Sequence, residues 1–363
     1  MSKARELSQR AGVDGALSNR NLIINGAMQV AQRGTSATAA VNSSYSTVDR
    51  FEFYLSGGGA YTTERSTGHL ADTGHDTALK IAVTTADTSI AAGDYYSFLQ
   101  KIEAQNLQRL QYGTSSAKEM TLSFWVRATK TGTQTMFVSK NDSTQYNFVQ
   151  EYTINQSDTW EYKTIKIPAL TASGITNDNG LGIQVGWILK YGSTYEGAAG
   201  SWVSSTTLFT TSNAVNNMDS TSNTFYLTGV QLEVDDTATP FEHRSYGQEL
   251  ALCQRFFWGF NDASGITEQF IIYGLTSTAA QMPIVFPTEM RAAPAALVMN
   301  SSPYWENFPW NSVGTSLSGL AFNVGHLSAS GGELLFSGTF SPTLSRGVNY
   351  TIAANCVAFD AEL

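Results

Sequence analysis

Four side chains that lie close together in the sequence have the chemistry of metal ligands: His69, Asp72, His75 and Asp76. Imidazole nitrogens and carboxylate oxygens both bind metal ions, but the segment 68–76 is also rich in polar residues that form turns. This composition favours a solvated loop over a metal site. The chain holds 4 histidines, and none falls in the HExxH spacing of helical zinc hydrolases. The sequence also lacks the GxSxG pattern of serine hydrolases and the GxxxxGK(S/T) pattern of phosphate-binding loops.

Paired carboxylates are the catalytic arrangement that a sequence reveals least, because the acid and base of a glycosidase come from unrelated positions. Asp235, Asp236 and Glu242 are candidates only in this sense, and two adjacent aspartates after a strand are more typical of a turn. The run Asn177-Asp178-Asn179-Gly180 has oxygen ligands for calcium, but it lacks the spacing and the closing Glu of an EF-hand. A plain Asn-Gly turn is the better interpretation. The sequence predicts no cofactor and leaves a structural calcium ion as an open alternative.

One stretch combines flat aromatic rings with amides and a carboxylate, which are the side chains that suit a sugar. It runs S-P-Y-W-E-N-F-P-W from Ser302 to Trp310, and its two prolines predict a loop rather than a regular strand. The apolar C–H face of a sugar stacks on an aromatic ring while its hydroxyls bond amides and carboxylates. The candidate carbohydrate-binding residues are Tyr304, Trp305, Glu306, Asn307, Phe308, Trp310 and Asn311. The alternative is that these rings fill a domain core or a subunit interface.

Length and composition indicate a folded chain of two domains. The 363 residues exceed the roughly 150 of one ordinary domain, and 42% of them are hydrophobic. Charged residues make up only 14%, and the formal net charge of -9 argues against nucleic-acid binding, which needs clustered Lys and Arg. Residues 1–16 lack the apolar core of a signal peptide, and no window approaches the roughly 20 apolar residues of a membrane span. Cys253 and Cys356 are expected to be two buried thiols rather than a disulfide.

Alternating side chains predict a series of short strands from residue 21 onward. The clearest examples are Leu122–Val126, Met136–Val138, Trp160–Ile167, Gly182–Lys190 and Tyr226–Val234. Turn residues and prolines separate these strands, and no crossover helices intervene. The pattern is typical of an antiparallel β-sandwich. A second, smaller β-rich domain is expected after residue 258, with a hairpin turn at Gly331-Gly332.

Two segments favour helix instead of strand. Tyr95–Tyr112 places Leu99, Ile102 and Leu110 at near-helical spacing, which predicts a short helix or turn packed on the sandwich. The second segment, Tyr246–Phe257, has apolar residues one turn apart and lies where the composition shifts. We therefore place the domain boundary there.

The predicted organisation has four parts. An N-terminal segment covers residues 1–20, a sandwich 21–245, a short helical linker 246–258 and a tip domain 259–363. The first segment is either a frayed terminus or an anchor that becomes ordered against a partner. Its candidate anchoring residues are Lys3, Arg5, Leu7 and Arg10.

Several blocks of this sequence resemble a widespread group of fibre and tail proteins of tailed bacteriophages. The first block is N-L-I-I-N-G-A-M-Q-V-A-Q-R-G, which begins at Asn21, followed by Asp49-Arg50-Phe51. Further similar blocks are T-L-S-F-W-V-R-A (121–128), D-T-W-E-Y-K-T-I (158–165), G-V-Q-L-E-V through A-T-P-F-E-H-R-S-Y (229–246), E-L-A-L-C-Q-R-F-F (249–257), F-P-T-E-M-R-A-A-P (286–294) and F-D-A-E-L (359–363). The resemblance covers most of the chain.

The resemblance implies a jelly-roll sandwich similar to a carbohydrate-binding module for residues 21 to about 244, in a homotrimer, followed by a β-rich tip. It implies a non-enzymatic virion protein, a tail fibre or adhesin subunit, that is made in the host cytoplasm without a signal peptide. Its N-terminal segment would join other tail, baseplate, portal or capsid proteins, and its distal domain would bind a bacterial surface polysaccharide. Two alternatives are a head fibre or tail decoration protein with a structural role only, and a capsule-degrading depolymerase or esterase.

Overall fold

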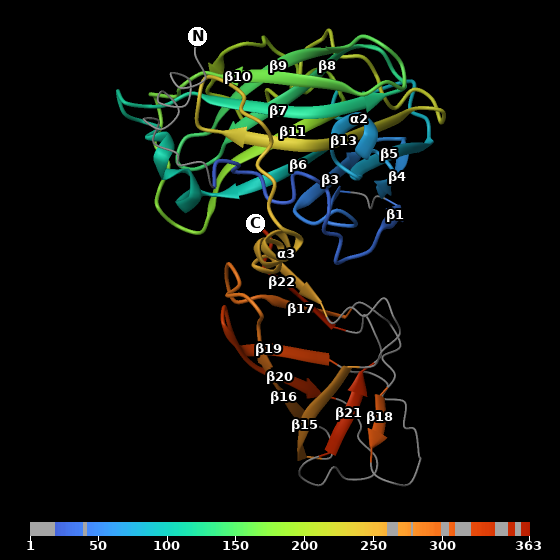
Figure 1. Cartoon of the computed structure of the whole chain (residues 1–363), viewed down its shortest axis with the longest axis vertical. Coiled ribbons are helices and arrows are strands. Elements are labelled where there is room, and N and C mark those ends of the chain that lie inside the picture. The colour runs from blue at the N-terminus through green and yellow to red at the C-terminus, as the bar shows by residue number, and fades with distance from the viewer. Residues whose placement is uncertain are drawn as a thin grey trace. The chain divides into compact units, whose positions relative to one another are not determined.

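The computed structural model describes residues 19–38, 42–259, 268–276, 279–298, 305–308, 321–337, 348–352 and 357–363. The chain divides into two compact units (Figure 1). One unit is Met1–Glu249 with Leu363, and the other is Leu250–Glu362. The division falls inside helix α3 (Tyr246–Gln254), within the segment for which the sequence predicts a helix.

The first unit is a sandwich of two antiparallel sheets. Sheet I has the strand order β1-β4-β5-β13-β7-β10, and sheet II has the order β12-β9-β8-β11-β6-β3-β2. The strands of sheet I are β1 (Ser36–Thr38), β4 (Ala60–Thr67), β5 (Thr77–Thr85), β7 (Met120–Ala128), β10 (Glu161–Ile167) and β13 (Thr224–Glu233). Those of sheet II are β2 (Asn42–Ser44), β3 (Phe51–Ser56), β6 (Tyr95–Glu103), β8 (Gly132–Lys140), β9 (Tyr146–Ile154), β11 (Leu181–Tyr191) and β12 (Trp202–Val203).

The central strands of the two sheets have the connectivity of a jelly roll. Sheet I contains the row β5-β13-β7-β10, and sheet II contains the row β6-β11-β8-β9. The last strand, β13, therefore lies between β5 and β7, and β11 lies between β6 and β8. This interleaving is what two Greek keys produce in a jelly roll. It confirms the all-β fold that the sequence predicts.

The core lies between the two sheets and is dominated by aromatic rings. Trp187 of β11 is fully buried at its centre. Its ring stacks on Phe98 at 5.6 Å between centroids and meets Phe124 of the opposite sheet edge-on, also at 5.6 Å. Such ring pairs add stability beyond the burial of their area.

A second hydrophobic cluster covers the outer face of sheet II and corrects one prediction. The connection between β11 and β13 places Leu208 and Phe209 against Leu99, Phe137 and other residues of that face. Because β6 is buried on both faces, its side chains do not alternate between apolar and polar, so the segment 95–112 resembled a helix. It is instead strand β6 followed by the 3-10 helix η1 (Ala104–Leu110).

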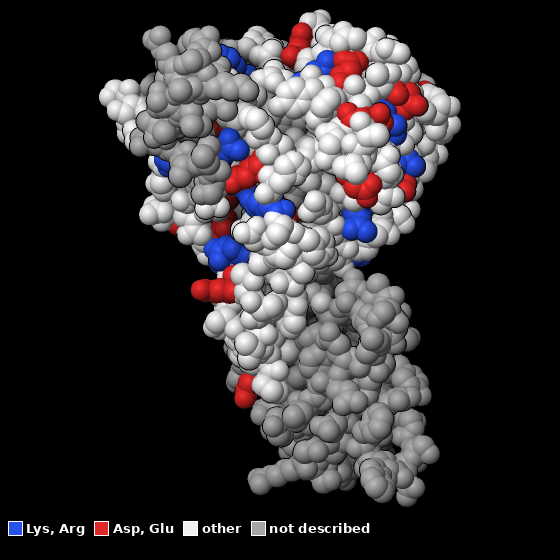
Figure 2. Space-filling model, in the orientation of Figure 1, with Lys and Arg blue, Asp and Glu red and all other residues white. Residues whose placement is uncertain are grey.

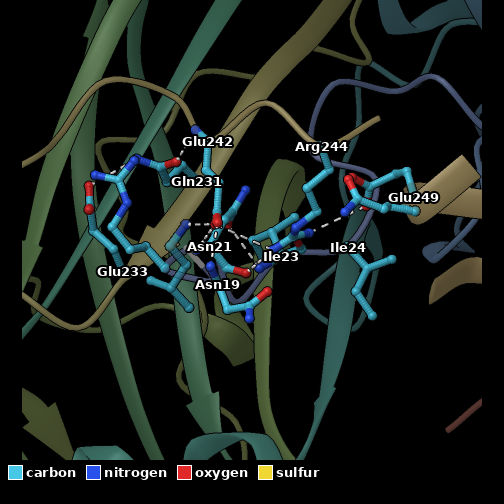
Figure 3. Close-up of polar contacts among 12 residues, drawn as sticks. Asn19, Asn21, Ile23, Ile24, Gln231, Glu233, Glu242, Arg244 and Glu249 are labelled. Carbon is cyan, nitrogen blue, oxygen red and sulfur yellow. Dashed lines mark hydrogen bonds and ion pairs between the residues drawn. The ribbon is translucent and has the colours of Figure 1, made fainter. Parts of the chain in front are cut away.

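A polar network ties the start of the jelly roll to the segment that follows β13 (Figure 3). The Asn21 side chain donates to the Val230 carbonyl and accepts from the Leu232 amide, both at 3.0 Å. The Glu242 carboxylate accepts from the amides of Asn19 and Asn21, the latter at 2.7 Å. The side chain of Asn21 therefore continues the hydrogen bonding of β13 where the strand bulges.

Arg244 completes this network and joins it to α3. Its guanidinium donates to the carbonyl of Ile23 at 3.0 Å and to that of Asn21, and it lies 3.5 Å from the Glu249 carboxylate. Glu249 in turn accepts from the Asn25 amide (Figure 3). These residues belong to the blocks N-L-I-I-N-G, E-H-R-S-Y and E-L-A-L. Residues from three of the blocks that resemble phage fibre and tail proteins therefore contact one another. They connect the start of the jelly roll to the segment after β13 and to α3.

Helix α3 begins with a capping box. The Gln248 amide donates to Ser245 Oγ at 3.3 Å, and the Ser245 amide donates to Gln248 Oε1 at 3.0 Å. The helix ends at Gln254, so the last residue of the predicted helix, Phe257, instead begins strand β14 (Phe257–Gly259). Cys253 is buried in the helix, and Cys356 lies outside the described residues.

The second unit consists of two smaller antiparallel sheets. Their strand orders are β14-β22-β17 and β18-β21-β15-β16-β20-β19. The strands are β15 (Glu268–Thr276), β16 (Ala279–Val285), β17 (Ala295–Val298), β18 (Trp305–Phe308), β19 (Ala321–Ser328), β20 (Gly331–Ser337), β21 (Val348–Ile352) and β22 (Val357–Asp360). Trp258 stacks on Phe359 at 5.7 Å and Phe286 meets both rings edge-on, which makes a small aromatic core.

Two predictions in this unit need correction. The aromatic stretch was expected to be a loop, but Trp305–Phe308 forms strand β18 and pairs with β21. Pro303 and Pro309 flank this four-residue strand and so remove no hydrogen bond from its interior. The hairpin between β19 and β20 turns at Ala329-Ser330, because Gly331 and Gly332 already pair with β19.

Candidate functional site

The outer face of sheet I carries a group of aromatic side chains around one arginine. Trp125 and Arg127 alternate along β7 with the buried Phe124 and Val126. Because successive side chains of a strand lie on opposite faces of the sheet, Trp125 and Arg127 point away from the core. The same alternation turns Tyr226 of β13 and Tyr162 of β10 to this face. We name the group the ring patch; its members are Trp125, Arg127, Trp160, Tyr162 and Tyr226.

Strand register places the members of the ring patch beside one another. Tyr162 lies opposite Trp125, and the two ring centroids are 5.3 Å apart. Arg127 lies opposite Tyr226 on the other neighbouring strand. Tyr162, the second residue of the edge strand β10, remains 46% exposed. The patch therefore presents an accessible ring on a rigid sheet.

Aromatic rings hold Arg127 in place. Its Cζ lies 3.9 Å from the ring centroid of Tyr226 and 5.3 Å from that of Trp160, which is within cation–π range. Its Nε is buried without a hydrogen-bond partner among the described residues, and Asp158 Oδ1 lies 3.5 Å away. The indole Nε1 of Trp160 is likewise buried without an acceptor in this part of the chain. Two donors with unmet hydrogen-bonding capacity thus lie in one place.

Helix α2 (Leu70–Thr73) borders the ring patch, and it replaces the predicted solvated loop. His69 is only 7% exposed, because its ring packs edge-on against Trp160 and Tyr226 at 5.4 and 5.8 Å. Its Nε2 lies 3.0 Å from Ser66 Oγ. Burial lowers the pKa of His69, and the charge of Arg127 lowers it further. The segment packs on the sheet because its two histidines cover the aromatic surface.

His75 extends the patch toward the segment that follows β13. Its ring lies 4.5 Å from Phe241 and 5.4 Å from His243 between centroids. A Cβ on Gly229, which has φ +59°, would lie 2.7 Å from His75 Nε2 and 3.0 Å from Trp125. Only glycine leaves room for these two rings at the bulge of β13. Burial lowers the pKa of His75 to about 4, and the charge of His243 contributes to the lowering.

The residues that the sequence predicts as functional fall outside the ring patch. The side chains of Trp305, Glu306, Asn307 and Phe308 in β18 are not among those described, and Tyr304, Trp310 and Asn311 lie outside the described residues. The anchoring candidates Lys3, Arg5, Leu7 and Arg10 also lie outside them. Both assignments therefore stay predictions.

The candidate carboxylates take structural positions. Asp235 and Asp236 lie in a bend after β13, and Glu242 bonds the amides of the network described above. Asp178 accepts the Gly180 amide at 2.8 Å, as in a turn. Among the described residues, no group of three or more His, Cys, Asp or Glu is placed to hold a metal ion. Within the same residues, no helix has both the length and the apolar character needed to cross a membrane.

A hollow of about 500 Å³ opens beside η1. Its lining consists of Leu107, Gln108, Gln111, Tyr112, Thr114, Ser116 and Ile175. The Tyr112 hydroxyl is buried without a hydrogen-bond partner in the described structure, and its ring packs edge-on against Trp202. None of the lining residues is charged, and only one is aromatic. The ring patch combines several aromatic rings with a guanidinium, so it can make more kinds of contact with a ligand than this hollow can.

Acidic and basic side chains are interspersed over the first unit rather than gathered by sign (Figure 2). Most of the described surface in this view is uncharged. Long-range attraction of a polyanion such as DNA needs a broad basic surface. Recognition on this face therefore depends on short-range contacts.

No family model matches the chain, and no curated protein matches it either. Among solved structures, a putative sugar-binding protein from Bacteroides thetaiotaomicron is 11% identical with a TM-score of 0.33, over 60% of this chain and 100% of that one. The enzymatically active domain of bacteriophage CBA120 tailspike protein 4 is 10% identical with a TM-score of 0.30, over 59% of this chain and 21% of that one. A family 11 carbohydrate-binding module from Clostridium thermocellum is 15% identical with a TM-score of 0.28, over 57% of this chain and 100% of that one. This chain thus spans about a fifth of the tailspike domain, and its jelly-roll assignment rests on its own strand order.

Proposed function

We propose that this chain is a virion structural protein, a tail fibre or adhesin subunit, that binds a bacterial surface glycan without transforming it. The observation that carries the proposal is the ring patch on a rigid sheet, with Tyr162 exposed beside Trp125. A sugar ring places its C–H face on such aromatic rings, and polar neighbours orient its hydroxyls. The low charged fraction of the chain, 14%, suits contact with hydrated polysaccharide.

The virion role is supported by the sequence blocks that resemble phage fibre and tail proteins. Attachment through residues 1–20 and assembly as a homotrimer belong to the same proposal. A single sugar site of millimolar affinity contributes only about 4 kcal/mol, which does not hold a particle on a cell. Several linked copies raise the avidity roughly 10² to 10⁴-fold when they engage together. A trimer repeated on a virion supplies such copies.

Binding of the full chain to an array of bacterial polysaccharides tests this function. We expect Tyr162→Ala to lower binding of the recognised glycan about 10-fold, because the most exposed ring of the patch is lost. Tyr246→Ala is the matched control, since Tyr246 is 57% exposed but lies on α3. Equal binding by the wild type and Tyr162→Ala would remove the ring patch from the function. Release of reducing ends or acetate from the bound glycan would contradict the non-enzymatic role.

The stretch Tyr304–Asn311 is proposed as a second sugar-binding surface. Only its aromatic, amide and carboxylate composition supports this assignment. Replacing Trp310 by Ala in the full chain tests it independently of the ring patch. We expect this change to lower glycan binding while Tyr162→Ala lowers it further. No change in binding with Trp310→Ala would restrict the site to the first unit.

A further inference from the structure

Arg127 differs from Arg65, Arg109 and Arg244 in what its guanidinium contacts. Arg109 and Arg244 each donate to two backbone carbonyls, and Arg65 donates to one. Arg127 has no hydrogen bond to an acceptor among the described residues, yet its side chain is only 19% exposed. Its Cζ lies 3.9 Å from the ring centroid of Tyr226, and a guanidinium stacked on a ring in this way keeps its in-plane N–H groups for planar acceptors.

The nearby charges compensate the charge of Arg127 only in part. Along the same row of sheet I, Lys80 lies opposite Tyr226 and pairs with Glu64 at 3.0 Å, so these two charges neutralise each other. The carboxylate of Asp158 is 64% exposed and 3.5 Å from Arg127 Nε, which is a weak surface contact. His69 carries no charge at neutral pH, because its pKa is lowered. A largely buried cation whose one nearby anion is an exposed carboxylate can still bind a further anionic group.

The indole of Trp160 adds a directed donor to this cation. Its Nε1 is buried without an acceptor among the described residues, and its ring lies 5.3 Å from the Arg127 Cζ. A carboxylate has two oxygens with four lone pairs, so one group can accept from both side chains. The Tyr162–Trp125 ring pair continues on the same face, next to Arg127 along β7. The arrangement thus places two aromatic rings, inclined by 54° to each other, beside a cation that can bind an anion.

We propose that the ring patch selects an acidic saccharide, whose carboxylate accepts hydrogen bonds from Arg127 and Trp160 while a sugar ring stacks on Tyr162 and Trp125. This inference rests on the proposed function and adds the chemical class of the glycan. Uronic acids and other carboxylated sugars have the required group on a ring. A bidentate guanidinium–carboxylate pair is among the stronger polar contacts, and a neutral hydroxymethyl group with one oxygen cannot form it.

The test compares oligogalacturonate with the same oligosaccharide after its carboxyl groups are reduced, using calorimetry on the full chain. We expect the acidic form to bind at least 10-fold more tightly. Arg127→Gln should remove this preference by weakening the binding of the acidic form at least 10-fold. Arg127→Lys retains the charge and much of the packing but loses the planar guanidinium that donates two parallel hydrogen bonds. We expect it to lower the preference for the acidic form to about 3-fold.

Lys80→Gln is the matched control, because it removes the same charge from the same row of the sheet. We expect it to leave the preference for the acidic form unchanged, and thermal unfolding of each variant reports whether it folds.

Equal affinity of the wild type for both oligosaccharides would overturn the inference and leave the proposed function standing. Tighter binding of a sulfated oligosaccharide of the same length would also overturn the carboxylate assignment. Loss of an oligomer on Arg127→Gln would show that a second copy of the chain covers this face. Failure of every glycan to bind would instead refute the proposed function.

Discussion

The buried ring of His75 makes the stability of the jelly roll depend on pH. Burial lowers its pKa from 6.5 to about 4, and His243 adds to the lowering. Between these two pH values the unfolded chain binds a proton that the folded chain does not, so stability falls as pH falls through this range. We expect the wild type to lose about 2 kcal/mol between pH 7 and pH 4 that His75→Phe retains. Urea unfolding at several pH values measures this, and parallel losses in the two proteins would contradict it.

Glu161 is a carboxylate whose lowered pKa also makes the fold less stable as pH falls, but in a more acidic range. Burial alone would raise its pKa, but hydrogen bonds from Lys163 and from Asn155 and Gln156 outweigh burial and lower the pKa to about 2. Its ionised form therefore stabilises the fold above pH 4.5, and this contribution is lost as pH falls toward 2. Glu161→Gln should cost about 1–2 kcal/mol at pH 7 and nearly nothing at pH 2. The exposed Glu119→Gln serves as control, and an equal cost of Glu161→Gln at both pH values would refute the assignment.

At the scale of elements, the segment before β1 is held against β13 by a close backbone approach. A Cβ on Gly26 would lie 2.1 Å from the Val230 carbonyl oxygen, and the Val230 amide donates to the Gly26 carbonyl at 2.9 Å. Gly26→Ala must push the two segments apart, which we expect to cost about 3 kcal/mol of unfolding free energy. Gly247→Ala on α3 meets no atom within 4 Å and should change stability by less than about 1 kcal/mol. Denaturant unfolding measures both, and similar values for the two variants would contradict the packing.

The strands with one polar face could be predicted from the sequence, and so could β11, whereas β6 could not. β7 and β13 show the period of two, because one side faces the core and the other faces solvent or a covering segment. β6 has Phe98 in the main core and Leu99 in the second cluster, so adjacent apolar residues belong to opposite faces and hide the period of two. That second cluster forms because the long connection after β11 packs on the outer face of sheet II. A contact between segments so far apart in the chain leaves no local hydrophobic pattern in the sequence.

The ring patch could not be predicted for a related reason. Its members come from β7, β13 and the start of β10, which adjoin only because β13 inserts between β5 and β7. From the sequence alone, the aromatic residues predicted to bind a sugar are those that are neighbours in the chain, as in Tyr304–Asn311. The signal for the patch was present in T-L-S-F-W-V-R-A, where the outward positions hold Trp125 and Arg127. Only the strand order shows that these outward residues meet Tyr162 and Tyr226.

At the scale of the whole molecule, the proposed adhesin needs weak sites on a multivalent particle. We expect the mass of the full chain in solution, measured by light scattering, to be that of a trimer. A trimer should bind an immobilised glycan at least 10²-fold more tightly than it binds the soluble monovalent fragment, because linked copies rebind. A monomer in solution, or equal affinity in both formats, would contradict the multivalent mechanism.

A crystal structure of the full chain with a bound acidic oligosaccharide tests the central claim most directly. The account predicts a sugar ring against Tyr162 and Trp125, with its carboxylate within hydrogen-bond distance of Arg127. A saccharide bound elsewhere while Tyr162, Trp125 and Arg127 stay empty would contradict it.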